Sequence, residues 1–258
     1  MKSLTEPLGR ALIQMADETG RMIALFSETI LLCRHVLHQF HRTAIQLVRV
    51  GPESLPIAGM MALFTGIVLA MHSGYALREY GSEAMLSTIV ALSMVKEMGP
   101  VLTGMLVAGR MGAAFAAEIG TMRVNEEIDA LETLGINPVR YLCVPRLTAC
   151  IVMVPALVVF AEIIGILGGL IVASAYFDIP ADSYFDSVFR SVDVEDVAEG
   201  LVKALVFGML IATISCYRGL QTRGGARGVG EAITRCVVQC FVWIFVSNYF
   251  VTRFFVTG

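Results

Sequence analysis

The chain has 258 residues, of which 56% are hydrophobic and 16% charged, and its mean hydropathy is +0.73. Soluble domains carry about a quarter charged residues, so this composition is typical of an integral membrane protein. The formal net charge of -3 argues against a nucleic-acid partner. The six cysteines form no Cys-x-x-Cys pair, and we expect small apolar core residues there rather than ligands or a disulfide.

Residues 1–50 are amphipathic. Apolar residues recur at the helical period of 3.6, and Arg and His fill the other face, which predicts a helix lying along the cytoplasmic membrane interface. The alternative is a soluble helix packed on another protein. The first residues are polar and no signal peptide is visible, so we expect an uncleaved inner-membrane protein. Gly51, Pro52 and Pro56 end this helix and turn the chain into the membrane.

Residues 51–258 contain five apolar segments of the length that a transmembrane helix needs. They cover residues 54–77, 84–117, 147–177, 203–217 and 236–252. The third segment contains Gly165 and Gly169, a small-xxx-small pattern that favours close packing of two helices. The sequence therefore predicts an all-α integral membrane protein with an N-terminal interfacial helix and five spans.

The orientation follows from the positions of Lys and Arg, which are enriched on the cytoplasmic side. Basic residues cluster before the first span, between the second and third, and between the fourth and fifth. The opposite connections contain Arg78 and Arg190, and the loop at about 178–199 is rich in acids. This pattern predicts a cytoplasmic N-terminus and a periplasmic C-terminus. In the periplasmic loop we expect either a short helix or a solvated segment.

An island of charge at residues 118–138 separates the second and third spans, on the predicted cytoplasmic side. Asn125 is a good N-cap, Gly135 suits the left-handed position after a helix, and Pro138 prevents its continuation. These signals predict a helix of about nine residues within about 122–135. Its apolar face has Val124, Ile128, Leu131 and Gly135, and its polar face has Glu126, Asp129 and Thr133. The helix either docks a soluble partner or covers its own bundle.

Four charged residues fall inside predicted spans: Lys96, Glu97, Glu162 and Lys203. Charges at this depth are costly and usually functional. Lys96 and Glu97 are neighbours about 100° apart on a helix, so each needs a partner elsewhere. We hypothesise a pair between Glu97 and Lys203, across helices or across subunits. The group either lines a cavity for a lipid headgroup or fixes helix register.

Several long motifs resemble MlaE-type permeases, the membrane subunits of MCE-linked ABC transporters that move phospholipid between bacterial membranes. They occupy residues 97–113, 117–124, 127–131, 144–146 and 225–230, and the similarity covers roughly residues 50–258. One departure is Glu127, where the family is expected to have Gln.

The resemblance implies a non-catalytic homodimer in the inner membrane of a Gram-negative bacterium, which maintains outer-membrane lipid asymmetry. Its partners would be a cytosolic ATPase, a periplasmic MCE-domain protein and, as an open possibility, a STAS-domain subunit. The charged island would be a coupling helix seated on the ATPase, through Val124, Glu126, Glu127, Ile128, Asp129 and Leu131. ATP and Mg would bind that partner, since this chain has no Gly-x-x-x-x-Gly-Lys-Ser/Thr motif, and no cofactor or metal is expected on this chain.

The resemblance also implies an outward-opening lipid cavity at the homodimer interface. Carried onto this chain, with Lys203 added for its charge, its residues are Leu69, Ala76, Leu77, Tyr80, Lys96, Glu97, Met98 and Lys203.

Two other functions are open. An ion-coupled secondary transporter would be driven by protonation of Glu97 or Glu162, but five spans and no visible repeat argue against it. An integral-membrane enzyme acting on lipid would need a metal cluster or an activated nucleophile, and the sequence shows neither pattern.

Overall fold

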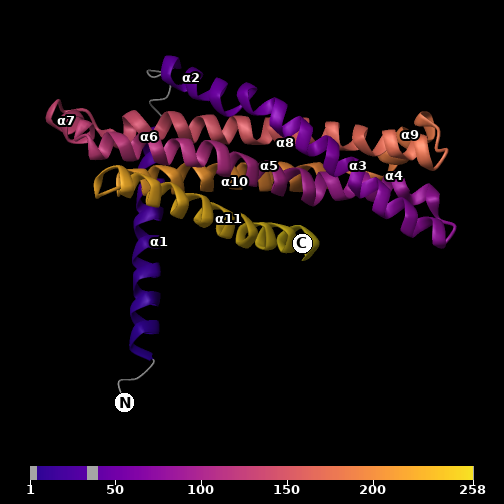
Figure 1. Ribbon diagram of the computed structural model, residues 1–258, viewed down its shortest axis with the longest axis horizontal. Helices are drawn as coiled ribbons and strands as arrows, with labels where there is room; N and C mark the ends of the chain where they lie inside the picture. Colours follow the sequence, from indigo (N-terminus) through magenta and orange to yellow (C-terminus); the bar gives the residue numbers. More distant parts are fainter. Residues whose placement is uncertain (1–4, 34–39, 258) are drawn as a thin grey trace.

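The computed structural model describes residues 5–33 and 40–257, and the regular elements of this part are all helices (Figure 1). The N-terminal part has α1 (Thr5–Cys33) and α2 (Phe40–Val50), followed by α3 (Leu55–Glu79). The second span is built from α4 (Leu86–Ser93), α5 (Gly99–Val107) and α6 (Ala113–Val124). The remainder has α7 (Glu127–Thr133), α8 (Val144–Tyr176), α9 (Ala181–Ser191), α10 (Val194–Leu220) and α11 (Gly225–Thr257).

Short tighter or wider turns join these helices. Two 3₁₀ turns, η2 (Pro52–Ser54) and η3 (Glu83–Met85), precede α3 and α4. Three π-helical segments, η4 (Met94–Met98), η5 (Ala108–Gly112) and η6 (Val139–Cys143), interrupt the second span and precede α8. Because π-bulges insert an extra residue into a helix, η4 and η5 change which side chains the second span turns toward its neighbours.

Five continuous helical stretches are long and apolar enough to cross a membrane: Phe40–Glu79, Leu86–Val124, Val139–Tyr176, Val194–Leu220 and Gly225–Thr257. The five predicted spans are therefore confirmed by length and composition. The fourth begins well before Lys203, because Asp193 and Asp196 form a capping box that starts α10. The predicted loop at about 178–199 is correspondingly shorter, and of the two alternatives for it, a short helix or a solvated segment, the structure has the helix, α9.

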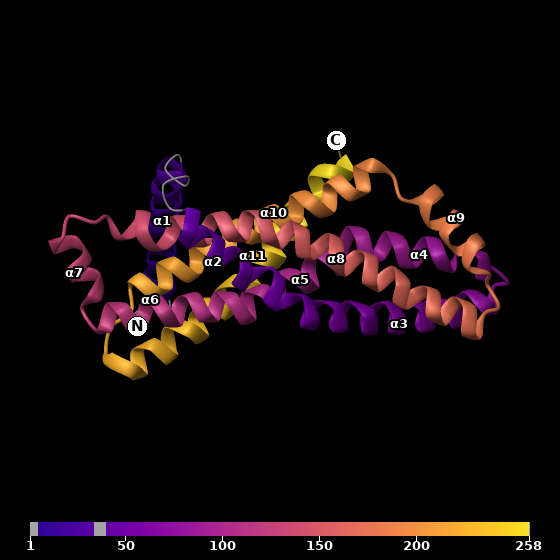
Figure 2. The same ribbon diagram turned by 90° about the horizontal axis from the view of Figure 1, so that it is seen from above.

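The spans lie side by side, with α7 at one end of the bundle and α9 at the other (Figures 1 and 2). The structure differs from the predicted single amphipathic helix over residues 1–50, of which residues 1–4 and 34–39 lie outside the described part. α1 crosses the spans, whereas α2 runs with them (Figure 1). α2 packs on α8, and Arg49 pairs with Glu118 of α6 at 2.6 Å, so α2 is attached to the bundle.

α3 and α8 pack closely together, because glycines remove the side chains between them. A methyl group built on Gly66 would overlap the carbonyl oxygen of Gly165, and one on Gly168 would lie 2.5 Å from the carbonyl oxygen of Leu63. The predicted close packing at Gly165 is confirmed. Gly169 instead makes room for Tyr184 of α9.

Tyr184 attaches α9 to this helix pair. Its side chain is fully buried, and its hydroxyl donates a hydrogen bond to the carbonyl of Ile166 at 3.1 Å. Burial raises the pKa of Tyr184 to about 12, because the apolar surroundings disfavour the phenolate. The ring is therefore a neutral anchor at physiological pH.

Gly66→Ala should destabilise the protein by about 1–3 kcal/mol, because the added methyl group has only backbone to displace. The matched control is Gly109→Ala, where a Cβ meets nothing within 4 Å. Thermal unfolding in detergent should show a lower midpoint for the first variant and an unchanged or higher one for the second. Equal midpoints would contradict the close contact.

Candidate functional site

A buried lysine lies where the second span is irregular. Pro100 has no N–H to offer the carbonyl of Lys96, four residues earlier, and η4 forms at this point. Nζ of Lys203, from α10, donates a hydrogen bond to that carbonyl oxygen at 2.6 Å. Lys203 is 0% exposed, so its buried ammonium donates to a carbonyl that lacks the usual donor four residues on.

Two carboxylates neutralise this buried ammonium. Nζ of Lys203 lies 2.9 Å from Oε1 of Glu97 and 2.9 Å from Oε1 of Glu199. The hypothesised pair between Glu97 and Lys203 is therefore present, and it forms across helices within one chain. Breaking a buried pair by removing one partner leaves an uncompensated charge, which is strongly destabilising.

The last span holds Glu97 from its other side. Asn248 donates to Oε2 of Glu97 at 2.9 Å, and the hydroxyl of Thr252 donates to Oε1 at 3.1 Å. Hydrogen bonds to a carboxylate favour its ionised form. Residues of two other spans thus hold the carboxylate of Glu97, and the side chain of Glu97 is still 39% exposed.

Lys96 belongs to the same cluster. Its Nζ lies 2.8 Å from Oδ1 of Asp196 and 3.6 Å from Oε2 of Glu199, and its side chain is 38% exposed. The neighbours Lys96 and Glu97 thus have separate partners, as their helical spacing required. The result is a cation and an anion side by side, both half-exposed, at the end of the bundle nearer α9.

The other predicted lipid-binding residues lie on α3, just after it, and on η4. Leu69 and Leu77 of α3 pack partly against the apolar cluster that includes Ala70 and Phe177. Ala76 is exposed, Met98 is 40% exposed, and Tyr80, just after α3, is 80% exposed. Lys203 is below the surface, so in this structure it positions Glu97 and does not itself reach a ligand.

Four residues of the cluster were not predicted as site residues: Asp196, Glu199, Asn248 and Thr252. The sequence held one usable signal, since Glu199 and Lys203 are four residues apart and share a helix face. That signal was lost because the acids were assigned to the loop before α10. Asn248 and Thr252 gave no local signal, because their role depends on how α11 packs.

Glu162 of α8 is buried beside this cluster. A methyl group on Gly99 would lie 2.8 Å from its Cγ, and one on Gly200 would lie 3.2 Å from its Oε1. Among the described residues, no hydrogen bond or ion pair to Glu162 is found. Two glycines therefore make the space that this carboxyl occupies.

The charged island divides into two helices. α6 continues to Val124, so Asn125 ends that helix and is not the N-cap that we predicted. Glu126 precedes α7 in the left-handed conformation, with φ 61°, instead of lying in its first turn. Gly135 does take the left-handed position after α7, with φ 72°, which confirms that part of the prediction.

The apolar face of α7 packs on the protein's own bundle. Ile128 is 2% exposed and packs with Ile119, Leu142 and Cys216, so it is unavailable to a partner, contrary to its predicted coupling role. Val124 and Leu131 are half-buried. The exposed residues of α7 include the acids Glu127, Asp129 and Glu132, besides Ala130 and Thr133, and the exposed Glu126 directly precedes them.

Ion pairs with arginines attach α6, the helix that leads into α7, to α2 and α8. Glu118 of α6 accepts hydrogen bonds at 2.6 Å both from Arg49 of α2 and from Arg146 of α8. Near α7, Arg123 pairs with Asp129 at 2.5 Å. Since Glu118 joins three spans, the acidic surface of α7 is attached to a rigid part of the bundle.

Five long apolar helices with a charged cluster inside them define a multi-pass membrane protein. Residues 43–254 match the family model described as Permease MlaE. A "Probable ABC transporter permease protein" of Rickettsia bellii is 40% identical over 255 residues, 98% of each chain. One from Synechocystis is 41% identical over 235 residues, 90% of this chain and 89% of that protein.

A plant relative is more distant. "Protein TRIGALACTOSYLDIACYLGLYCEROL 1, chloroplastic" of Arabidopsis thaliana is 36% identical over 219 residues, 85% of this chain and 63% of that protein. Together these matches show that the chain is a membrane permease subunit of the ABC transporter type. It belongs to the MlaE permease family.

Lys203→Met should lower stability by about 3–5 kcal/mol, because it leaves Glu199 and Glu97 without their buried cation. Arg227→Met is the matched control, since it removes a surface pair in which Arg227 is 91% exposed and should cost about 0–1 kcal/mol. The measurement is thermal unfolding of each purified variant in the same detergent. A small effect at both positions would show that Lys203 is not the centre of the cluster.

Proposed function

We propose that this chain is the permease subunit of an ABC transporter that moves phospholipid between the inner and outer membranes of a Gram-negative bacterium and so maintains outer-membrane lipid asymmetry. The observation that carries the proposal is the half-exposed pair of Lys96 and Glu97, held inside a membrane bundle by the buried Lys203. A zwitterionic headgroup has both a phosphate and a cation, and this pair offers a partner for each.

The chain supplies the membrane half of the transporter, and ATP and Mg belong to a cytosolic ATPase. The acidic surface of α7 is the proposed docking site for that ATPase, through Glu126, Glu127, Asp129 and the half-buried Leu131 and Val124. This assignment agrees with the ABC transporter names of the relatives. It places the N-terminus and α7 in the cytoplasm, and α9 and the C-terminus in the periplasm, where an MCE-domain protein would bind.

A homodimer is the proposed assembly, because α11 leaves an apolar face uncovered. Val242, Phe245, Tyr249, Phe250 and Phe254 are all exposed on it. Asn248 and Thr252 of the same helix hold Glu97, so a second copy packed on α11 would border the charged pair. The lipid cavity would then lie between the two copies, with Leu69, Ala76, Leu77, Tyr80 and Met98 around its mouth. A STAS-domain subunit remains a possible further partner.

The direct test is gentle purification of the chain with whatever binds it, followed by reconstitution. We expect a stoichiometric ATPase to co-purify, and transfer of labelled phospholipid to require ATP. Transfer driven by a proton gradient without any ATPase would favour the secondary transporter instead, for which the unpaired carboxyl of Glu162 is the one supporting observation.

Asp129→Lys should abolish phospholipid transfer while the partner ATPase still hydrolyses ATP, because it reverses a charge on the docking surface of α7. Asp129 also pairs with Arg123, so Arg123→Gln is the control that breaks the same pair without reversing the charge of α7. That control should keep most of the transfer. Normal transfer by the Asp129 variant would count against α7 as the coupling helix.

A further inference from the structure

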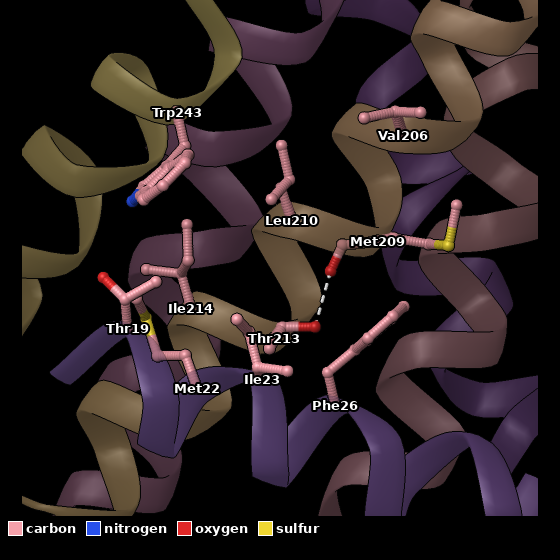
Figure 3. A pocket seen from close by; sticks show the side chains of 10 residues that line it. All are labelled: Thr19, Met22, Ile23, Phe26, Val206, Met209, Leu210, Thr213, Ile214 and Trp243. Carbon is pink, nitrogen blue, oxygen red and sulfur yellow. Dashed lines mark hydrogen bonds between the residues drawn. The ribbon is translucent and has the colours of Figure 1, made fainter. Parts of the chain in front are cut away.

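A hollow of the molecule lies where α1 crosses α10 and α11, beginning three residues after Lys203 on α10. It has a volume of about 350 Å³, and we name it the α1 groove. Its walls come from three helices, with Met22, Ile23 and Phe26 from α1, Val206 and Leu210 from α10, and Trp243 from α11 (Figure 3). The side chains of these helices converge on a common space, which is open on one side.

The walls of the α1 groove are almost entirely hydrocarbon. The hydroxyl of Thr213 donates to the carbonyl of Met209 at 2.7 Å, so it is satisfied within α10 (Figure 3). Ile23 is 62% exposed at the edge of the groove. An apolar hollow of this kind is a poor site for water, because water needs two or more polar partners. The natural occupant is a hydrocarbon chain.

Polar groups next to the groove indicate which hydrocarbon this is. One turn further along α10, and across α1 from the groove, lies a polar hollow of about 220 Å³ lined by Arg218, Arg223 and Arg235. Arg218 forms an ion pair with Glu18 at 2.8 Å, and Arg235 forms a longer one with Glu231 at 3.6 Å. Arg223 has no ion pair within the described part of the chain. Basic pockets at the membrane surface are typical binding sites for lipid phosphate.

The groove comes before the arginines along α10. Ile214, the last α10 residue of the groove, is four residues before Arg218, so about 6 Å of helix separates the two hollows at 1.5 Å per residue. Arg218 lies in the last turn of α10, whereas the groove lies further inside this span. The arginines thus lie nearer the end of the span, where a lipid phosphate is expected, and the groove lies nearer its middle, where acyl chains are expected.

We propose that the α1 groove binds one acyl chain of a phospholipid from the leaflet on the α7 side, with the phosphate directed toward Arg223. In the orientation proposed above this is the cytoplasmic leaflet. The site is separate from Lys96 and Glu97, which lie toward the α9 end. It does not depend on which molecule the transporter moves. The bound chain fills the angle between α1 and the spans and so fixes α1 against the bundle.

The sole tryptophan of the chain, Trp243, lines the groove and gives a direct probe. The full chain, purified in detergent, is titrated with a phospholipid that has brominated acyl chains. Bromine quenches tryptophan on contact. If the groove binds a chain, quenching should saturate near one brominated phospholipid per protein chain.

Two matched double variants of α10 control the experiment. Val206→Phe with Leu210→Phe fills the groove, and Val202→Phe with Leu205→Phe makes the same changes at exposed positions outside it. The first should lose the saturating part of the quenching, and the second should behave as the unchanged protein does. If the first does not fold, the saturation curve of the unchanged protein still decides.

Two results would overturn the proposal. Quenching that rises with added brominated lipid without saturating, equally in the unchanged protein and in both double variants, would show non-specific contact with lipid only. Weak quenching at every ratio of lipid to protein would show that protein, such as a second copy of the chain, covers Trp243. Neither result depends on transport or on a partner ATPase, so the proposed function stands or falls separately.

Discussion

The rest of the bundle depends on one buried cation. Pro100 removes the usual helical donor of the Lys96 carbonyl, and the ammonium of Lys203 donates a hydrogen bond to this carbonyl. A charge in that position needs carboxylates close by, and Glu97 and Glu199 meet this need from two different helices. The irregular segment of the second span is therefore linked to the buried ion pairs of Lys203 with Glu97 and Glu199.

This arrangement explains how charged groups can be displayed inside a membrane. Lys203 and Glu199 are buried and neutralise each other, while Lys96 and Glu97 use their remaining exposed surface toward the outside of the subunit. Asn248 and Thr252 add α11 to the same cluster. A headgroup binding there would meet fixed charges, which need little reorganisation to receive it.

The two ends of the second span have different tasks. Lys96 and Glu97 lie on η4 toward the α9 end, and α6 leads into α7 at the opposite end. From Glu97 to Val124 the helix rises by about 40 Å. This length is continuous apart from η4 and η5, and Glu118 ties its α7 end to α2 and α8. The second span therefore connects α7 directly to the charged pair of Lys96 and Glu97.

The sequence by itself determined the spans, because runs of apolar residues must cross a membrane as helices wherever they pack. Gly135 and the helix near residues 127–133 also followed from local signals, since turn and cap preferences act over a few residues. Only the tertiary structure decided that α1 and α2 take different directions, and that Ile128 faces its own bundle. It also decided that Asn248 and Thr252 join Glu97, since contacts between residues more than a hundred positions apart depend on how helices pack and leave no local pattern.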